Sequence, residues 1–182
     1  MKILLLVDNY YPSTKSVASI MRDLALELVH LGHDVVVAAA ADGLPQKVSV
    51  TQEEGTTVLR VDTGGLKSAG RVLRAWRECR LSARMWRGGK DFFRSNPCDL
   101  IIVYSPSIFL GELVQKLKQL WDCPSYLVLR DIFPKWALEA GVLKPGPVYN
   151  FFRRKELQLY RAVDLIAVEA PGNLRYFAEE LG

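Results

Sequence analysis

Short apolar runs alternate along the chain with longer segments in which apolar residues recur at helical spacing. The apolar runs are five or six residues long, as is typical of strands buried in a parallel sheet. The predicted strands cover residues 2–7, 35–40, 57–61, 99–103, 125–129 and 163–168. The predicted helices cover residues 16–31, a long segment from Gly64 broken near Gly88 and Gly89, residues 108–121, a segment that follows the break at residues 144–147 and ends near Ala162, and a last short helix from about Gly172. Polar residues 51–55 leave open whether a short hairpin precedes the third strand.

This alternation of strands and helices predicts an α/β fold, a Rossmann-like, doubly wound and mainly parallel sheet flanked by helices. In the common strand order 3-2-1-4-5-6, ligands bind between the carboxyl ends of the first and fourth strands. The loops at residues 9–16, 104–107 and 130–134 are therefore predicted to form the site. A length of 182 residues suits one such domain, so we expect residues 1–182 to fold as a single unit.

Composition and cysteine usage narrow the class of protein. Hydrophobic residues make up 49% of the chain and charged residues 24%, which excludes a disordered chain. Cys79, Cys98 and Cys123 form no C-x-x-C pair, so they predict reduced packing residues in a cytoplasmic protein. The run at 2–7 ends at Asp8 without a cleavage site, which favours a strand over a signal peptide. We expect any membrane contact to be peripheral, because no apolar run is long enough to cross a bilayer.

The loop at residues 9–16 leads into the N-terminus of a predicted helix. Free backbone amides and the helix dipole favour an anion such as a phosphate there, and Lys15 would add a positive charge. In the alternative, Ser13, Thr14 or Ser16 only caps the helix while Lys15 faces water. The chain has neither a G-x-G-x-x-G fingerprint nor a Walker motif, which disfavours a nucleotide-binding oxidoreductase.

Polar side chains also follow the fourth and fifth predicted strands. Ser105 either offers a hydroxyl for sugar recognition or caps a turn. Arg130 and Asp131 come directly after a buried strand, so they must be paired or must face a polar crevice. An internal ion pair and a contact with a ligand are both compatible with that position.

Neither a metal site nor an acid/base pair can be assigned. His30 and His33 have ligand-like spacing, but Gly32 ends the helix between them and no further ligand lies nearby. The carboxylates that follow strands could accept a proton from a substrate hydroxyl, but no two of them form an identifiable couple. These carboxylates are Asp8, Asp131 and Glu169.

Positive charge is concentrated in residues 67–94, which hold nine basic and two acidic residues although the whole chain has a net charge of only +4. On a helical wheel, one side of this segment is apolar, with Val72, Ala75, Trp76, Cys79, Ala83 and Trp86. The other side carries Arg74, Arg77, Arg80, Arg84 and Arg87. Either the arginines are solvated, or they face the anionic cytoplasmic surface of a membrane. We expect no nucleic-acid partner, because no known binding module is present.

Several segments resemble a known family. Residues 2–12 (KILLLVDNYYP), 28–37 (LVHLGHDVVV) and 54–61 (EGTTVLRV) resemble the N-terminal domain of family 4 retaining glycosyltransferases of the GT-B type. Residues 129–137 (LRDIFPKWA), followed by 141–143 (GVL), are similar to bacterial O-antigen and capsule transferases of the N-acetylfucosamine type. The resemblance covers essentially the whole chain.

The resemblance implies an acceptor-binding domain of an enzyme that moves a sugar from a nucleotide-sugar donor to a polyprenyl-linked saccharide in the synthesis of lipopolysaccharide O-antigen or capsule. It implies retained anomeric configuration and no metal or other cofactor. The donor-binding domain, with its E-x7-E glutamates, is expected outside these residues, since no such spacing occurs here. We therefore expect the chain alone to be inactive. A non-catalytic, membrane-side subunit of a split transferase is the alternative.

The resemblance also implies which residues face the acceptor and which face the membrane. The acceptor is expected to lie against Tyr11, Lys15, Ser105, Arg130 and Asp131, with the five arginines of the wheel turned toward the membrane. Lys15 and Ser16 stand where the family has two glycines near the donor diphosphate, and Lys15 would supply positive charge in their place.

Overall fold

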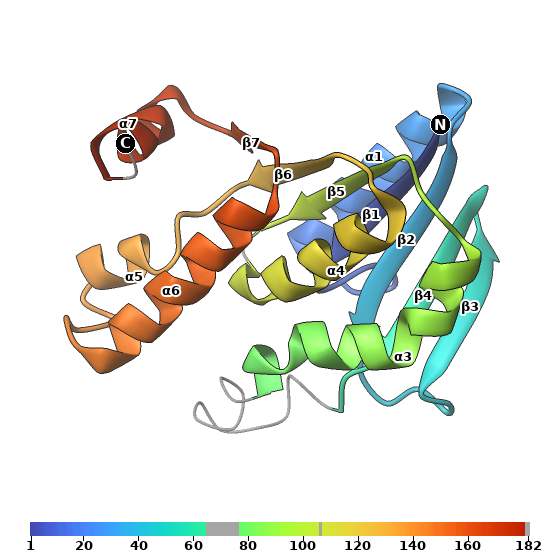
Figure 1. Ribbon diagram of the computed structural model, residues 1–182, viewed down its shortest axis with the longest axis horizontal. Coiled ribbons are helices and arrows are strands. Elements are labelled where there is room, and N and C mark those ends of the chain that lie inside the picture. The colour runs from blue at the N-terminus through green and yellow to red at the C-terminus, as the bar shows by residue number, and fades with distance from the viewer. Residues whose placement is uncertain (65–76, 106, 181–182) are drawn as a thin grey trace.

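Seven strands form one sheet in the computed structural model, which describes residues 1–64, 77–105 and 107–180 (Figure 1). The strands are β1 (Lys2–Val7), β2 (Asp34–Ala41), β3 (Val48–Glu53), β4 (Thr56–Asp62), β5 (Leu100–Tyr104), β6 (Ser125–Leu129) and β7 (Leu165–Val168). They lie in the order β3-β4-β2-β1-β5-β6-β7, and all neighbours are parallel except β3 and β4. The predicted α/β fold and strand order are confirmed, with β3 added at one edge.

The edge strand β3 confirms the hairpin that the sequence left open. It pairs with β4 from Val48 opposite Val61 to Glu53 opposite Thr56. The two loop residues, Glu54 and Gly55, have φ angles of 50° and 81°, as a tight hairpin turn with right-handed strand twist requires. The hairpin therefore begins at Val48, earlier than the polar residues 51–55 indicated.

Helices cover both faces of the sheet (Figure 1). One face carries α1 (Ser16–His30), and the other carries α3 (Leu81–Ser95), the short 3-10 helix η1 (Ile108–Leu110), α4 (Gly111–Trp121) and α6 (Pro147–Ala162). Successive residues of β1 therefore enter two different cores: Leu5 packs on the α1 side and Leu4 on the other. Helices α5 (Lys135–Glu139) and α7 (Pro171–Glu180) follow the carboxyl ends of β6 and β7.

The predicted break at Gly88 and Gly89 is wrong, because α3 runs through both residues. A Cβ at Gly88 would lie 2.5 Å from Cγ1 of Val61, and one at Gly89 would lie 2.6 Å from the Phe93 ring. The glycines thus let α3 approach β4 closely, which outweighs their low helix propensity. The earlier part of the predicted helix falls mostly in residues 65–76, outside the described residues.

The helical wheel of the basic segment is also wrong in part, because it assumed one uninterrupted helix. α3 begins at Leu81 and buries Leu81, Met85 and Phe93, whereas Ala83, which the wheel placed on the apolar side, is exposed. The Arg84 guanidinium donates a hydrogen bond to the Thr63 carbonyl, so it is partly engaged within the fold.

The remaining wheel arginines differ in their surroundings. Arg77 and Arg80 also interact within the fold, whereas Arg87 is exposed. Arg74 lies outside the described residues. Membrane contact by these arginines stays a prediction. No helix in the described ranges is both long and apolar enough to cross a membrane.

The three cysteines occupy the positions expected of reduced packing residues. Cys98 and Cys123 are buried, Cys79 is half-buried, and all three are free thiols. Burial raises the pKa of Cys98 to about 12, so its thiol stays protonated at neutral pH.

Arg60 on β4 joins the edge hairpin to the loop after β1. Its Nη1 and Nη2 atoms donate to the two carboxylate oxygens of Glu53 at 2.6 and 2.8 Å. Nη2 also donates to the Tyr11 carbonyl oxygen at 2.7 Å. Both partners of the pair are partly buried, and the Arg60 hydrogen bond lowers the pKa of Glu53.

The crossing of α4 and α6 predicts that Gly111→Ala destabilises the protein. A Cβ at Gly111 would lie 2.9 Å from the Leu159 backbone nitrogen and Cα, which cannot move as a side chain can. We expect the free energy of unfolding, measured by urea denaturation, to fall by about 1–3 kcal/mol. In the control Gly172→Ala, where a Cβ meets nothing within 4 Å, we expect a change below about 0.5 kcal/mol. Equal losses in both variants would contradict this.

The Glu53 pair predicts a pH-dependent contribution to stability. Because the folded pKa of Glu53 lies below its ordinary value of 4.5, the contribution is present above that value and is lost as pH falls through the folded pKa. We expect Glu53→Gln to lower the free energy of unfolding by roughly 1–2 kcal/mol at pH 7 and by much less in acid. The comparison is urea denaturation of both proteins across that pH range.

Glu54→Gln is the matched control. Glu54 pairs with Arg22, but its side chain is 47% exposed, so we expect little change at any pH. A Glu53→Gln effect that does not shrink on acidification would rule out the charged pair as its source.

Candidate functional site

A crevice opens between the carboxyl ends of β1 and β5, where the sequence placed the site. From β1 the chain passes to α1 on one face of the sheet, and from β5 it passes to α4 on the other, so the two loops diverge. The cavity between them measures about 370 Å³. It is lined by Asp8, Asn9, Lys15, Ser16, Val17, Tyr104, Arg130 and Asp131. Three of the predicted site residues, Lys15, Arg130 and Asp131, are thus brought together.

The Arg130 guanidinium is held at this crevice by two hydroxyl groups. Its Nη1 donates to Ser16 Oγ at 3.2 Å and to the Tyr104 hydroxyl at 3.4 Å. These partners come from α1 and β5, so Arg130 bridges both sides of the crevice. The hydrogen bond to Tyr104 raises the pKa of Arg130. Because its hydrogen bonds go to hydroxyls and not to a carboxylate, the positive charge is available to an anion.

The N-terminus of α1 adds hydrogen-bond donors to the same crevice. Lys15 occupies the position before the helix, and no side chain in the described ranges caps it. Ser13 Oγ accepts a hydrogen bond at 3.4 Å from the Lys15 amide, but Lys15 precedes the first helical residue. The first amides of the helix therefore lack a side-chain acceptor, and with the helix dipole they favour an anion. Asp8 and Asp131 line the other parts of the crevice and would accept hydrogen bonds from hydroxyl groups.

Tyr11 lies in a neighbouring cavity of about 360 Å³, not in this crevice. The floor of that cavity is formed by residues 39–41, all alanines, and Arg60 also lines it. The Tyr11 side chain is 54% exposed, and the Arg22 guanidinium carbon lies 5.6 Å from the centre of its ring. The hydrogen bond from Arg60 to the Tyr11 carbonyl fixes the loop on this side.

Ser105 is fully buried and lines neither cavity. Its backbone amide donates to the Val128 carbonyl at 3.0 Å. Its hydroxyl has no hydrogen-bond partner within the described part of the chain. The structure therefore places Ser105 below the crevice, at the end of β5, and its contact with an acceptor stays a prediction.

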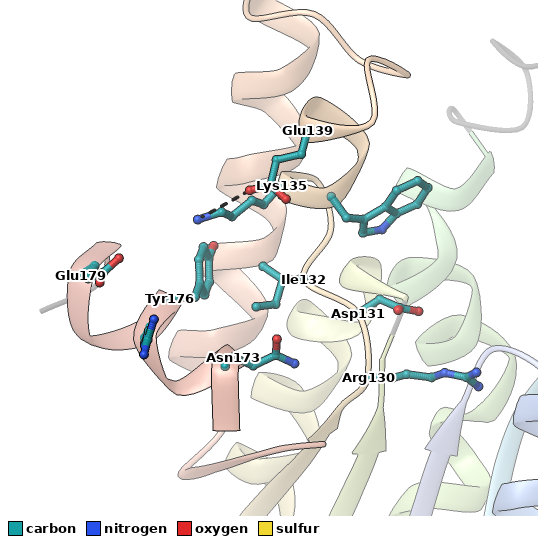
Figure 2. A pocket seen from close by; sticks show the side chains of 11 residues that line it. Arg130, Asp131, Ile132, Lys135, Glu139, Asn173, Tyr176 and Glu179 are labelled. Carbon is teal, nitrogen blue, oxygen red and sulfur yellow. Dashed lines mark ion pairs between the residues drawn. The ribbon is translucent and has the colours of Figure 1, made fainter. Parts of the chain in front are cut away.

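A third cavity, of about 340 Å³, lies between α5 and α7 and was not predicted (Figure 2). Arg130 and Asp131 contribute to its lining, but their side chains point away from α7. Asn173 points from α7 toward the segment that contains Ile132 (Figure 2). Lining residues 130–132, 135 and 136 lay within a motif that the sequence singled out, but nothing in the sequence indicated that α7 would stand opposite them. This cavity is called the α5–α7 pocket below.

A buried polar cluster on α6 holds α7 in place. The Glu156 carboxylate, which has no exposed surface, accepts hydrogen bonds from the Tyr160 and Tyr176 hydroxyls at 2.9 and 3.0 Å and from Arg153 Nη1 at 2.5 Å. Burial raises the pKa of Glu156. Lys135 Nζ lies 4.9 Å from the centre of the Tyr176 ring, which links α5 to the same cluster.

Candidate metal ligands do not gather anywhere in the described residues: no group of three or more His, Cys, Asp or Glu side chains is placed to hold an ion. Asp8 and Asp131 both line the crevice, whereas Glu169 follows β7 and is exposed. The structure therefore supports no assignment of an acid/base couple, and the catalytic residues stay unassigned.

The fold is shared with sugar-metabolising enzymes of known structure. Sucrose-phosphate synthase from Thermosynechococcus elongatus superposes with a TM-score of 0.62 and 12% identity over 99% of this chain and 83% of that chain. Trehalose-6-phosphate synthase from E. coli, solved with UDP-2-fluoro glucose bound, superposes with a TM-score of 0.53 and 11% identity over 98% of this chain and 42% of that chain. At these identities the likeness shows the fold alone.

Comparison with curated proteins finds no match. The sequence profile of the glycosyl transferase 4-like domain matches residues 17–182, which include α1 except for its first residue, all strands from β2 onward and every lining residue of the α5–α7 pocket. The chain belongs to the glycosyl transferase 4-like domain family.

Proposed function

We propose that this chain is the acceptor-side domain of a glycosyltransferase that moves a sugar from a nucleotide-sugar donor to a lipid-linked saccharide in the synthesis of a cell-surface polysaccharide. Membership of the glycosyl transferase 4-like domain family supports the transferase class. The UDP-2-fluoro glucose bound to the E. coli structure supports a nucleotide-sugar donor. Similarity of residues 129–137 to N-acetylfucosamine transferases makes that sugar the first donor to test.

The single observation that carries this proposal is the anion-binding geometry of the crevice. The uncapped N-terminus of α1, Lys15 and Arg130 all lie at one cavity. A diphosphate group, which joins a polyprenyl chain to its saccharide, carries the negative charge that these groups favour. Asp8 and Asp131 supply acceptors for neighbouring sugar hydroxyls. The donor would lie on a second domain, because transfer needs both substrates in one closed cleft.

Binding of a water-soluble, short-chain prenyl-diphosphate-linked saccharide tests this assignment. We expect the chain to bind it in calorimetry, and Lys15→Gln and Arg130→Gln each to weaken the affinity roughly tenfold, as loss of one charge-assisted hydrogen bond does. Lys47→Gln, at an exposed position away from the crevice, is the matched control and should bind like the wild type. A ligand affinity that is unchanged in both crevice variants would contradict the proposal.

A lipid-linked acceptor brings the domain to a membrane surface, and two surfaces of the chain have suitable chemistry. The first is the basic segment, where Arg87 is exposed on α3. The second lies around α5 and the start of α6, where Val148 and Phe151 are 59% and 40% exposed beside the exposed Arg154. Exposed apolar groups flanked by basic residues suit an anionic lipid interface.

Flotation with liposomes distinguishes these two surfaces. We expect the wild type to float with anionic liposomes and to remain in solution with neutral ones, because each basic residue near an anionic surface contributes about 1 kcal/mol. Arg87→Glu with Lys90→Glu, both at exposed positions on α3, removes the first surface, and Val148→Ser with Phe151→Ser removes the second. Loss in one double variant assigns the contact. Absence of wild-type flotation would show that the domain reaches its acceptor without binding the membrane.

A further inference from the structure

We propose that the α5–α7 pocket is a saccharide subsite that binds the sugar next to the diphosphate of the acceptor. This inference rests on the proposed function and assigns to it the α7 residues Asn173, Arg175 and Glu179, which neither the sequence motifs nor the family resemblance identified. The pocket adjoins the crevice at Arg130 and Asp131, which line both cavities. A ligand with its diphosphate in the crevice can therefore extend its first sugar into the α5–α7 pocket.

The polar groups of the pocket suit a neutral ring with several hydroxyls. Asn173 offers an amide with both donors and an acceptor, Arg175 offers a planar set of donors, and Glu179 offers acceptors. None of these three side chains has a hydrogen-bond partner among the described residues. Planar groups of this kind can bond two adjacent hydroxyls at once.

The charges of the pocket favour a neutral ligand over an anion. Besides Arg130 and Asp131, whose side chains point away from α7, the charged lining residues are Lys135, Glu139, Arg175 and Glu179 (Figure 2). They number two positive and two negative. Lys135 Nζ already lies 4.0 Å from Glu139 Oε1 and close to the Tyr176 ring. An anion would gain little from such paired charges. The crevice is also lined by two basic and two acidic residues, but its Arg130 is hydrogen-bonded to hydroxyls and the uncapped N-terminus of α1 lies beside it.

Two lining residues of the pocket add apolar surface, which the C–H groups of a sugar can contact. Ile132, on one wall, is half-buried, and the Tyr176 ring, on the other, is 5% exposed. A combination of apolar wall and few convergent polar groups is typical of small-molecule sites.

The wall formed by α7 is fixed before any ligand binds. The Tyr176 hydroxyl is bonded to the buried Glu156 carboxylate, and its ring lies near cations of both α5 and α6. α7 therefore presents Asn173 and Arg175 from a fixed position. A preformed site does not incur the entropy cost of ordering a mobile helix on binding.

The test is NMR titration of the isotopically labelled chain with free glucose, galactose, N-acetylglucosamine and N-acetylfucosamine, and separately with inorganic phosphate. We expect at least one sugar to shift the backbone amides of Ile132 and Lys135 and the side-chain amide of Asn173 with millimolar affinity. Phosphate should instead shift the amides of Ser16 and Val17.

Asn173→Ala and Arg175→Gln should each weaken sugar binding at least fivefold. Arg161→Gln, at an exposed position on α6 away from the pocket, is the matched control and should leave binding unchanged. If none of the four sugars shifts the pocket amides, or if both pocket variants bind like the wild type, the inference is wrong.

Failure of the inference and failure of the proposed function give different results. A prenyl-diphosphate-linked saccharide that shifts only the crevice amides would overturn the saccharide subsite and leave the acceptor domain standing. Free sugars that shift the pocket amides, combined with no binding of the prenyl diphosphate, would retain a saccharide site and overturn the lipid-linked acceptor.

Discussion

Burial of the central strands on both faces is the constraint on which the rest of the structure depends. β1 has no polar face, because its alternating side chains enter separate cores on the two sides of the sheet. Helices must therefore cover both faces, and the chain must leave β1 and β5 toward opposite ones. The divergence of those two loops creates the crevice. Lys15 and Arg130 both line it. Ser16, which follows Lys15, accepts a hydrogen bond from Arg130 although 114 positions separate the two residues.

The strands and their order could be predicted from sequence because the parallel strands are mostly continuous apolar runs, β4 shows period-two alternation, and the connections allow few topologies. The edge hairpin could only be left open, because a half-exposed strand such as β3 is polar enough to resemble a loop. The predicted helix break at Gly88 and Gly89 was wrong for a different reason. Low helix propensity is a local property, whereas their role is to let α3 contact β4, which the local sequence does not contain.

The candidate site could likewise be predicted only in part. Arg130 and Asp131, which directly follow β6, lie at the crevice as expected, because the fold class fixes where strands end. Tyr11 lies in a different cavity because Arg60, on a distant strand, holds its carbonyl. The α5–α7 pocket could not be predicted, because the position of α7 depends on a hydrogen bond from Tyr176 to the buried Glu156 carboxylate, 20 positions earlier in the chain.

Arg130 and Asp131 form a partition between two cavities. Their side chains point away from α7, the Arg130 guanidinium reaches the crevice, and the same two residues also line the α5–α7 pocket (Figure 2). Substitutions of the α7 residues that line the pocket can therefore change its shape without disturbing the crevice. The hydrogen bond between Tyr176 and Glu156 keeps the helix anchored. Under the proposed assignment of phosphate to the crevice and sugar to the pocket, the two specificities would then evolve as separate characters of one domain.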